Sequence, residues 1–559
     1  MRLYKSKTDP SNTPWFLFTG IAAGIALFYL GFLSARYNFD GTLFSLWLAQ
    51  AIQTGHLGEY YHPHHLFYGP ASYLFYKCLA AFGIKFSVVV TLQLLDILFA
   101  FSTILLFLIL CYQKTKDRFV SIVFGLLLAF SFGFWFFSIE PEVYIGYTFS
   151  IFVSIFILLS WTKPGPQPAW YIRAILLGIL GAFIITNHLT GGLFLLPIGW
   201  GCLWYVRDAP GQSLWIRFRK GIPPALLMML VTFAVIVPVY IRGYEANPLS
   251  KTLHFAHWII GATNPDTGLG YKNNIWNLSP AAFKGAAIGY EEIFLAGIHH
   301  RYLSIPGLGV LRILTLSGVL VGLILYLISL PRLMRNDKRA HTLLLLSILP
   351  MAAFVVVWDS ANFEVKVCLL PLLCLAMAFG FAETYQKAKR IHYRALIRLC
   401  VIVVLALLFT HNFFSSIKPG SRPELNKDLQ RAYFIRDNTE PGAVIYFTGY
   451  AGGYNMGKIY IIFFSGRQTR ILDLILGRDN RPFPQPLISS LNADRNRPIY
   501  VLPELIQPGT AVDSLGKNHK LKPQQIIEFF KALNLKRIAA MNDGFALYRY
   551  DPGPATKPK

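Results

Sequence analysis

The sequence predicts a polytopic α-helical membrane protein that ends in a small α/β domain. Of its 559 residues, 54% are hydrophobic and only 14% are charged, whereas about a quarter of the residues in a soluble domain are charged. Apolar runs of about 20 residues, the length that spans a bilayer, recur between residues 15 and 413. From about Ser415 onward charges become frequent and no run is long enough to span. The composition therefore excludes an ordinary soluble enzyme and a disordered chain.

About eleven apolar segments have the length of a membrane span. The first follows the basic residues Arg2, Lys5 and Lys7 but lacks a cleavage site of small residues, so we interpret it as a span and not as a signal peptide. The expected spans cover residues 15–33, 86–112, 119–137, 143–161, 171–186, 189–206, 222–241, 307–330, 342–357, 367–381 and 395–413.

The connectors between these spans alternate in charge. One kind is rich in Lys and Arg and occurs at residues 114–118, 163–173, 207–220, 332–339 and 387–398. The other kind carries almost none and occurs at 138–142, 187–189 and 358–366. Because cytoplasmic connectors are enriched in Lys and Arg, the N-terminus is expected in the cytoplasm and the protein in the inner (plasma) membrane. The Lys and Arg residues behind the net charge of +24 therefore indicate the orientation of the spans in the membrane and do not indicate a nucleic-acid partner.

An odd number of spans places the C-terminus outside, together with two long connectors at residues 34–85 and 242–306. Both connectors are more apolar than a solvated loop. In the first, residues 42–52 and 71–82 place apolar side chains on one side of a helix. Because such helices lie at a membrane surface, we expect them to roof a cavity at the outer interface.

The residues from 415 onward predict a small α/β domain outside the membrane. Its expected elements are helices at 426–437 and 523–533, strands at 443–447, 459–464 and 499–502, and a hairpin of 537–541 with 546–550.

Two other motifs could carry chemistry but do not match their patterns. Residues 452–458 fit the GxxxxGK pattern of a phosphate-binding loop, but Ile459 stands where such a loop has Ser or Thr, and a strand is expected next. The six cysteines include no CxxC pair and predict neither a disulfide framework nor a zinc site.

An enzyme that acts outside the cytoplasm has to take its activated group from a lipid carrier, such as a polyprenyl-phosphate sugar. Its reaction needs a carboxylate that deprotonates the acceptor hydroxyl. Asp40 is the first candidate, because it follows the first span and opens a surface helix, although it could also serve as that helix's N-cap. Glu140 and Glu142 lie in the outer turn 138–144 and could bind a divalent metal or an acceptor, or form a solvated turn.

The leaving phosphate of such a donor needs cationic or hydrogen-bonding groups. His64 and His65 lie in the first outer connector, and we expect them to contact phosphate or sugar in preference to zinc. The candidates that break the apolar pattern near the outer edges of spans are His188, Arg242, Glu364 and Lys366. Pairing within a loop and snorkelling of Arg242 are the structural alternatives. Asp96, inside the second span, could be functional or could bond only to neighbouring helices.

Five short motifs occur in an order that resembles bacterial members of the GT-C superfamily. They are Asp40 after the first span, Pro63-His64-His65, EPEVY at 140–144, NHLTG at 187–191 and WDSANFEVK at 358–366. The sequence is similar to the dolichyl-phosphate-mannose protein mannosyltransferases and the lipid A aminoarabinose transferases. It departs from the former because Gly41 follows Asp40 where they have a second acid, and the EPE turn is not the DxD of oligosaccharyltransferases.

The resemblance implies a GT-C fold, a polyprenyl-phosphate sugar donor and transfer with inversion to a lipid, glycan or protein acceptor. It implies that Asp40 is the general base and that Glu142 positions the acceptor or a metal such as Mg or Mn. It further implies that His64, His65 and Lys366 surround the donor phosphate, and Tyr144, in the EPEVY motif, is expected to bind substrate.

Two other classes of function stay open. A transporter or flippase of lipid-linked saccharides would have internal repeats and polar residues near the bilayer midplane. The sequence has no detectable repeat, and its polar residues gather at the outer edges of spans. A non-catalytic cell-envelope assembly protein would use the outer domain for binding.

Overall fold

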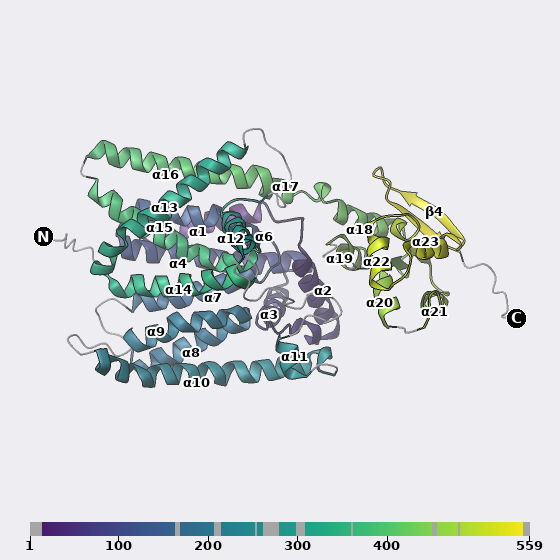
Figure 1. Cartoon of the computed structure of the whole chain (residues 1–559), viewed down its shortest axis with the longest axis horizontal. Coiled ribbons are helices and arrows are strands. Elements are labelled where there is room, and N and C mark those ends of the chain that lie inside the picture. Colours follow the sequence, from purple (N-terminus) through teal and green to yellow (C-terminus); the bar gives the residue numbers. More distant parts are fainter. Residues whose placement is uncertain are drawn as a thin grey trace. The chain divides into compact units, whose positions relative to one another are not determined.

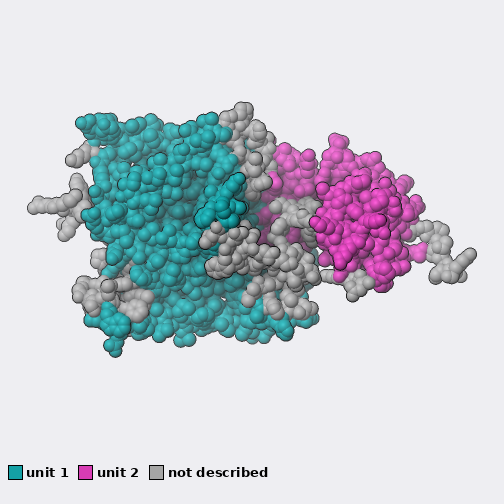
Figure 2. All heavy atoms as spheres, viewed as in Figure 1, with its two compact units in different colours: residues 1–34, 47–421 teal, residues 35–46, 422–559 magenta. Residues whose placement is uncertain are grey.

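The computed structural model describes residues 14–161, 168–205, 214–251, 254–260, 279–297, 308–358, 361–388, 390–449, 456–478 and 481–551. Parts of the expected basic connectors, of the connector 242–306 and of the GxxxxGK segment lie outside these ranges. The chain divides into two compact units, coloured separately in Figure 2. We call residues 1–34 with 47–421 the membrane unit, and residues 35–46 with 422–559 the C-terminal unit.

Long apolar helices build the membrane unit and lie side by side in Figure 1. In the described residues, 7 helices are long and apolar enough to cross a membrane. They include or lie within α4 (Val88–Thr115), α8 (Trp170–Asn187), α10 (Leu214–Ala246), α13 (Leu308–Asn336), α14 (Lys338–Trp358), α15 (Leu370–Lys387) and α16 (Ile391–Asn412). The pair α5 (Arg118–Phe130) and α6 (Phe132–Ile139) is an eighth candidate, bent by 62°.

Three shorter apolar helical stretches also occur where spans are expected. They are α1 (Trp15–Leu30), α7 (Tyr144–Ser160) and the stretch of η3 (Leu189–Phe194) and α9 (Leu195–Tyr205). The helices agree with a multi-pass membrane protein, and the count of eleven spans stays a prediction.

Burial orders the helices from the centre of the unit to its edge. Helix α4 packs against α1, α5, α7 and α15, and α15 is almost wholly buried. By contrast, most side chains of α10, α13 and α16 are not fully buried, and apolar ones such as Leu226 and Ile328 are exposed. An exposed apolar surface of this extent is typical of helices that face lipid.

Asn412, at the end of α16, joins segments that are far apart in the sequence. Its amide nitrogen donates to the carbonyl oxygens of Phe130 (2.9 Å) and Phe294 (2.8 Å), and its carbonyl oxygen accepts from the amide of Ala296 (3.0 Å). Phe130 precedes the bend between α5 and α6, where helix carbonyls lose their own partners. Asn412 therefore gives the Phe130 carbonyl, next to the bend, a hydrogen-bond partner in an apolar interior.

The first outer connector contains the two expected helices, α2 (Phe39–Thr54) and α3 (Tyr68–Ala81). The backbone amide of Phe67 donates to the carbonyl of Thr186 (2.9 Å), and Asn247 donates to the carbonyl of Tyr61 (2.9 Å). A Cβ at Gly69 would lie 2.7 Å from the carbonyl oxygen of Tyr60, so only glycine allows this close approach. These contacts hold the connector against α8 and α10.

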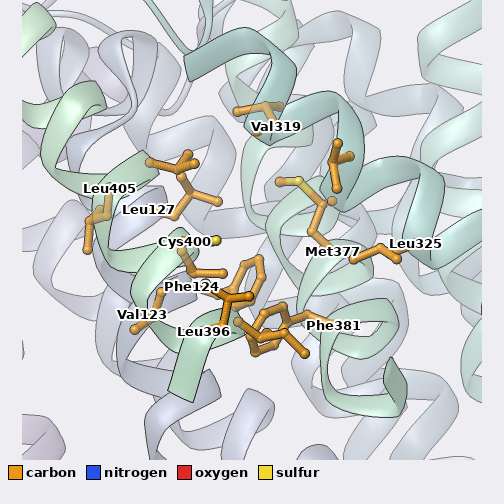
Figure 3. Close-up of a pocket in the computed structure, with 16 residues that line it drawn as sticks. Val123, Phe124, Leu127, Val319, Leu325, Met377, Phe381, Leu396, Cys400 and Leu405 are labelled. Carbon is orange, nitrogen blue, oxygen red and sulfur yellow. The ribbon is translucent and has the colours of Figure 1, made fainter. Parts of the chain in front are cut away.

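An apolar cavity of about 410 Å³ lies between helices of the membrane unit. Figure 3 shows side chains of α5, α13, α15 and α16 around it, among them Leu127, Val319, Met377 and Leu405.

The C-terminal unit contains a five-stranded mixed sheet of order β2-β1-β3-β5-β4. Its strands are β1 (Val444–Phe447), β2 (Gln468–Ile471), β3 (Ile499–Val501), β4 (Leu535–Ala540) and β5 (Ala546–Tyr550). β1 pairs in parallel with β2 and β3, whereas β4 and β5 form the expected antiparallel hairpin. The helices are α18 (Lys427–Asp437), α19 (Met456–Phe464), α20 (Leu472–Arg478), α21 (Gln485–Ala493), α22 (Thr510–Asn518) and α23 (Pro523–Lys531).

The structure corrects one expected strand of this unit. Residues 459–464 belong to helix α19, and the second parallel strand is β2, which the sequence did not predict. A helix and not a strand therefore follows the GxxxxGK segment, although Ile459 still occupies the Ser or Thr position. Lys458 is buried and forms an ion pair with Glu504 (2.8 Å), and it donates to the hydroxyl of Thr448.

Candidate functional site

Several buried polar side chains of the membrane unit, among them Asp96, Glu142, His188 and Lys366, gather at one end of its helices. They follow the C-termini of α6 and α8 and precede the N-termini of α7 and α15. Basic residues such as Lys114, Arg335 and Lys387 lie near the opposite ends of α4, α13 and α15. The motifs singled out in the sequence thus lie at the helix ends away from these basic connectors.

Asp96 is the centre of a carboxylate group at this end. It is fully buried in the third turn of α4, and its Oδ2 accepts hydrogen bonds from the hydroxyl of Tyr68 (3.1 Å) and the amide of Glu142 (3.1 Å). Glu140 and Glu142 are also fully buried, which excludes the solvated-turn interpretation. The carboxylate of Asp96 thus holds the main chain of the turn that carries Glu142.

Four imidazoles form a second group, in which His65 and His188 are buried and His62 and His64 are partly buried. The ring of His65 lies 5.4 Å from His62, 6.2 Å from His64 and 4.9 Å from His188, measured between centroids. The Nδ1 of His65 lies 3.3 Å from the carbonyl oxygen of Asn187, and the Nδ1 of His188 lies 2.7 Å from the hydroxyl of Thr190. The structure therefore brings the PHH and NHLTG motifs together.

Burial keeps these imidazoles neutral. Desolvation is the main cause that lowers the pKa of His62, His64 and His65, and it lowers the pKa of His188 to about 3. At neutral pH each ring offers one N–H donor and one acceptor nitrogen, which suits hydrogen bonds to sugar hydroxyls or phosphate oxygens.

The third group joins the EPEVY and WDSANFEVK motifs. The hydroxyl of Tyr144 donates to Glu364 (2.9 Å), which also accepts from the amide of Asn362 (3.2 Å). Lys366 is fully buried, donates to the carbonyl of Asn362 and lies 5.8 Å from the ring centroid of Tyr290. Tyr144 also lies 6.0 Å from His188 between ring centroids, so this group adjoins the imidazoles.

Two further expected site residues, Asp40 and Arg242, lie on other elements. Arg242 in α10 has a side chain that is 85% exposed and lies 3.9 Å from Glu245, as expected for snorkelling, and its contact with substrate stays a prediction. Asp40 lies on the first turn of α2 in the C-terminal unit. Within the described residues, no group of three or more His, Cys, Asp or Glu side chains could hold a metal ion. The metal expected at Glu140 and Glu142 stays a prediction.

The comparison with solved structures decides the fold. ArnT from Cupriavidus metallidurans bound to undecaprenyl phosphate matches with a TM-score of 0.57 and 12% identity, over 96% of this chain and 97% of that chain. The apo state of the same protein matches with a TM-score of 0.56 and 12% identity, over the same shares of each chain. ArnT is a GT-C glycosyltransferase. The chain has the GT-C fold.

A third solved structure is more distant. The Archaeoglobus fulgidus oligosaccharyltransferase matches with a TM-score of 0.48 and 11% identity, over 94% of this chain and 72% of that chain. No protein-family model matches the sequence, and no curated protein matches it either.

Several residues of the chain contact these groups but were not singled out from the sequence. Tyr68 donates to Asp96 in the carboxylate group, and the ring of Tyr290 lies beside Lys366. The only sequence signal for Asp96 is that a carboxylate inside an apolar span is costly unless it has a partner. Tyr68 offers no such signal, because an aromatic residue in an apolar helix is ordinary.

Proposed function

We propose that the chain is an integral-membrane glycosyltransferase. It moves a sugar from a polyprenyl-phosphate donor to an acceptor outside the cytoplasm, with inversion at the anomeric carbon. The observation that carries the proposal is the joining of four separate motifs into one set of buried carboxylates, imidazoles and a lysine. The fold supports it, because ArnT has been solved with undecaprenyl phosphate bound.

The burial of the polar groups favours catalysis over a purely structural role. Buried carboxylates and a buried lysine destabilise an apolar interior and persist where a function requires them. In a water-poor site, hydrogen bonds and charges act more strongly on a developing phosphate charge than they would in water. Lys366 supplies a positive charge for the donor phosphate, and His64, His65 and His188 supply neutral hydrogen bonds.

The proposed step is a single displacement. Asp40 accepts the proton of the acceptor hydroxyl while that oxygen attacks the anomeric carbon. The bond between the anomeric carbon and the phosphate oxygen breaks, and polyprenyl phosphate leaves with both electrons. Glu142 positions the acceptor, and Tyr144 with Glu364 binds the sugar. The positive-inside pattern of the connectors supports an extracytoplasmic location for this chemistry, at the plasma membrane.

The test uses the full chain in lipid nanodiscs with a panel of radiolabelled undecaprenyl-phosphate sugars and extracted membrane glycolipids as acceptors. We expect transfer from at least one donor, and a loss of at least a hundredfold in Asp40→Asn, because general base catalysis contributes about 10²–10⁴-fold. Glu528→Gln removes an exposed carboxylate of the C-terminal unit and is the matched control.

Two results would contradict the proposal at different levels. Folded wild-type protein that transfers no sugar from any donor would argue for a transporter or an assembly protein. Transfer at the wild-type rate by Asp40→Asn would leave the activity standing and remove Asp40 as the base.

A further inference from the structure

The segment that carries Asp40 folds with the C-terminal unit and not with the span that precedes it. Residues 35–46 group with residues 422–559, although nearly 400 residues separate them in the sequence. Three kinds of contact hold the segment: hydrogen bonds from Asn426, hydrogen bonds with Tyr460, and apolar packing along one face of α2.

Asn426 bonds to the segment and to its own helix at the same time. Its amide nitrogen donates to the carbonyl of Ala35 (2.9 Å) and to the hydroxyl of Tyr460 (3.1 Å). Its side-chain oxygen accepts from the amides of Asp428 and Leu429, both at 3.1 Å, and so caps α18. One fixed side chain therefore ties the main chain at Ala35 to the first turn of α18.

Tyr460 clamps the next residues of the segment. Its hydroxyl donates to the carbonyl of Tyr37 (2.7 Å) and accepts from the amide of Tyr37 (2.5 Å). The two aromatic rings stack at 6.0 Å between centroids, and Tyr460 is 1% exposed. A single side chain thus satisfies both backbone groups of Tyr37, much as a neighbouring strand would.

Apolar packing then fixes the start of α2. Phe39 and Leu43, four residues apart on one helix face, pack against Leu429, Ala432 and Ile459. Asp40 follows Phe39 directly, so this face orients the turn that carries the carboxylate.

Asp40 is not the cap of its helix. The side chain of Asn38 accepts from the amide of Gly41 (2.8 Å), and the carbonyl of Asn38 accepts from the amide of Thr42 (3.2 Å). Asn38 therefore caps α2, and N-capping does not explain the presence of Asp40.

We propose that Tyr460 and Asn426 are positioning residues for Asp40, so that contacts within the C-terminal unit set the orientation of the catalytic base. The inference rests on the proposed function, in which Asp40 is the general base. The physical reason is that catalysis by a base is sensitive to small errors in placement, since a displacement of about 1 Å can cost about 10²-fold in rate.

The experiment compares two tyrosine variants of the same unit. Tyr460→Phe removes the hydroxyl that bonds to Tyr37 and keeps the ring. Tyr446→Phe also removes a buried hydroxyl with two partners, Ser490 and Asp494, both at 2.9 Å, but it does not touch residues 35–46. We expect Tyr460→Phe to lower kcat for sugar transfer at least tenfold with little change in the donor KM. Tyr446→Phe should leave both constants near wild type.

Asn426→Asp provides a second variant, because it keeps the capping oxygen and loses the donor to Ala35. If Tyr460→Phe does not fold, as judged by thermal unfolding of the full chain, Asn426→Asp carries the comparison. Equal kcat in the Tyr460, Asn426 and Tyr446 variants, in a preparation whose Asp40→Asn variant is inactive, would overturn the positioning role and leave the proposed function intact. Full activity of Asp40→Asn would instead contradict the assignment of the base.

Discussion

The hydroxyl of Tyr144 donates a hydrogen bond to Glu364 at 2.9 Å, across 220 positions of the sequence. It joins the turn after α6 to the turn before α15, and it places a carboxylate beside the imidazole group. The bond connects the EPEVY and WDSANFEVK motifs. Its donor and its acceptor can be substituted separately.

Replacing Glu364 with Gln removes the negative charge of the side chain and keeps its size. The amide oxygen can still accept from Tyr144, so we expect a melting temperature within a few degrees of wild type and a rate of transfer at least tenfold lower. Tyr144→Phe should lower the free energy of unfolding by about 1 kcal/mol, since one hydrogen bond is lost. Thermal unfolding and initial rates of both variants check this. An active Glu364→Gln would show that the carboxylate serves only the fold.

Lys366 is expected to contribute affinity for the donor. Hydrogen bonds to charged groups contribute about 1.5–3 kcal/mol, so Lys366→Met should raise the donor KM by roughly 10- to 150-fold. Gly289→Ala should act in the same direction, because its Cβ would lie 2.6 Å from the Nζ of Lys366. Gly309→Ala is the control, since no atom lies within 4 Å of a Cβ there. Unchanged KM in both Lys366→Met and Gly289→Ala would refute the phosphate contact.

Stability should fall with decreasing pH because of the imidazoles. The pKa of His188 is lowered to about 3 in the folded protein, whereas an unfolded histidine titrates near 6.5. The unfolded chain therefore binds more protons between these values, and stability is lost as pH falls from about 6.5 toward 3, by up to about 1.4 kcal/mol per pH unit for this residue. Melting temperatures between pH 7.5 and pH 5 check the slope, which should be smaller in His188→Gln. If melting temperature depends on pH equally in His188→Gln and wild type, His188 does not contribute to the loss of stability.

The ion pair of Lys458 and Glu504 should stabilise the C-terminal unit. Burial lowers the pKa of Lys458, and Glu504 opposes that effect. Glu504→Gln leaves a buried ammonium without its counter-ion, and we expect a loss of about 2 kcal/mol, less than for a fully buried pair because Glu504 is partly exposed. The double variant Lys458→Met/Glu504→Leu should recover part of the loss. Thermal unfolding of the full chain measures both.

Hydropathy predicted the membrane helices well because the bilayer imposes one length and one composition on every span. The motif residues were also detectable, since Glu142, His188 and Lys366 each interrupt an apolar run. The strand predicted at residues 459–464 was wrong. The prediction followed from their β-branched and aromatic side chains, which favour a strand. Ile459 and Tyr460 instead pack on α18 as part of a helix, so tertiary contacts outweighed local propensity.

The grouping of residues 35–46 could not be predicted from any local signal. Tyr37 and Tyr460 are unremarkable aromatic residues in the sequence, and their pairing depends on where distant segments meet. Asp40 was selected correctly as the opening of a helix, but its neighbour Asn38 performs the capping. Short polar residues such as Asn38 are common in loops. The sequence therefore could not show whether Asn38 or Asp40 caps the helix.

The contacts of Asn412 bear on how the chain is assembled during synthesis. The carbonyl of Phe130 receives its side-chain donor from a residue 282 positions later. While the intervening helices are being synthesised, the carbonyl of Phe130, at the bent helix, does not yet have Asn412 as a hydrogen-bond donor. This hydrogen bond can therefore form only after α16 has been synthesised.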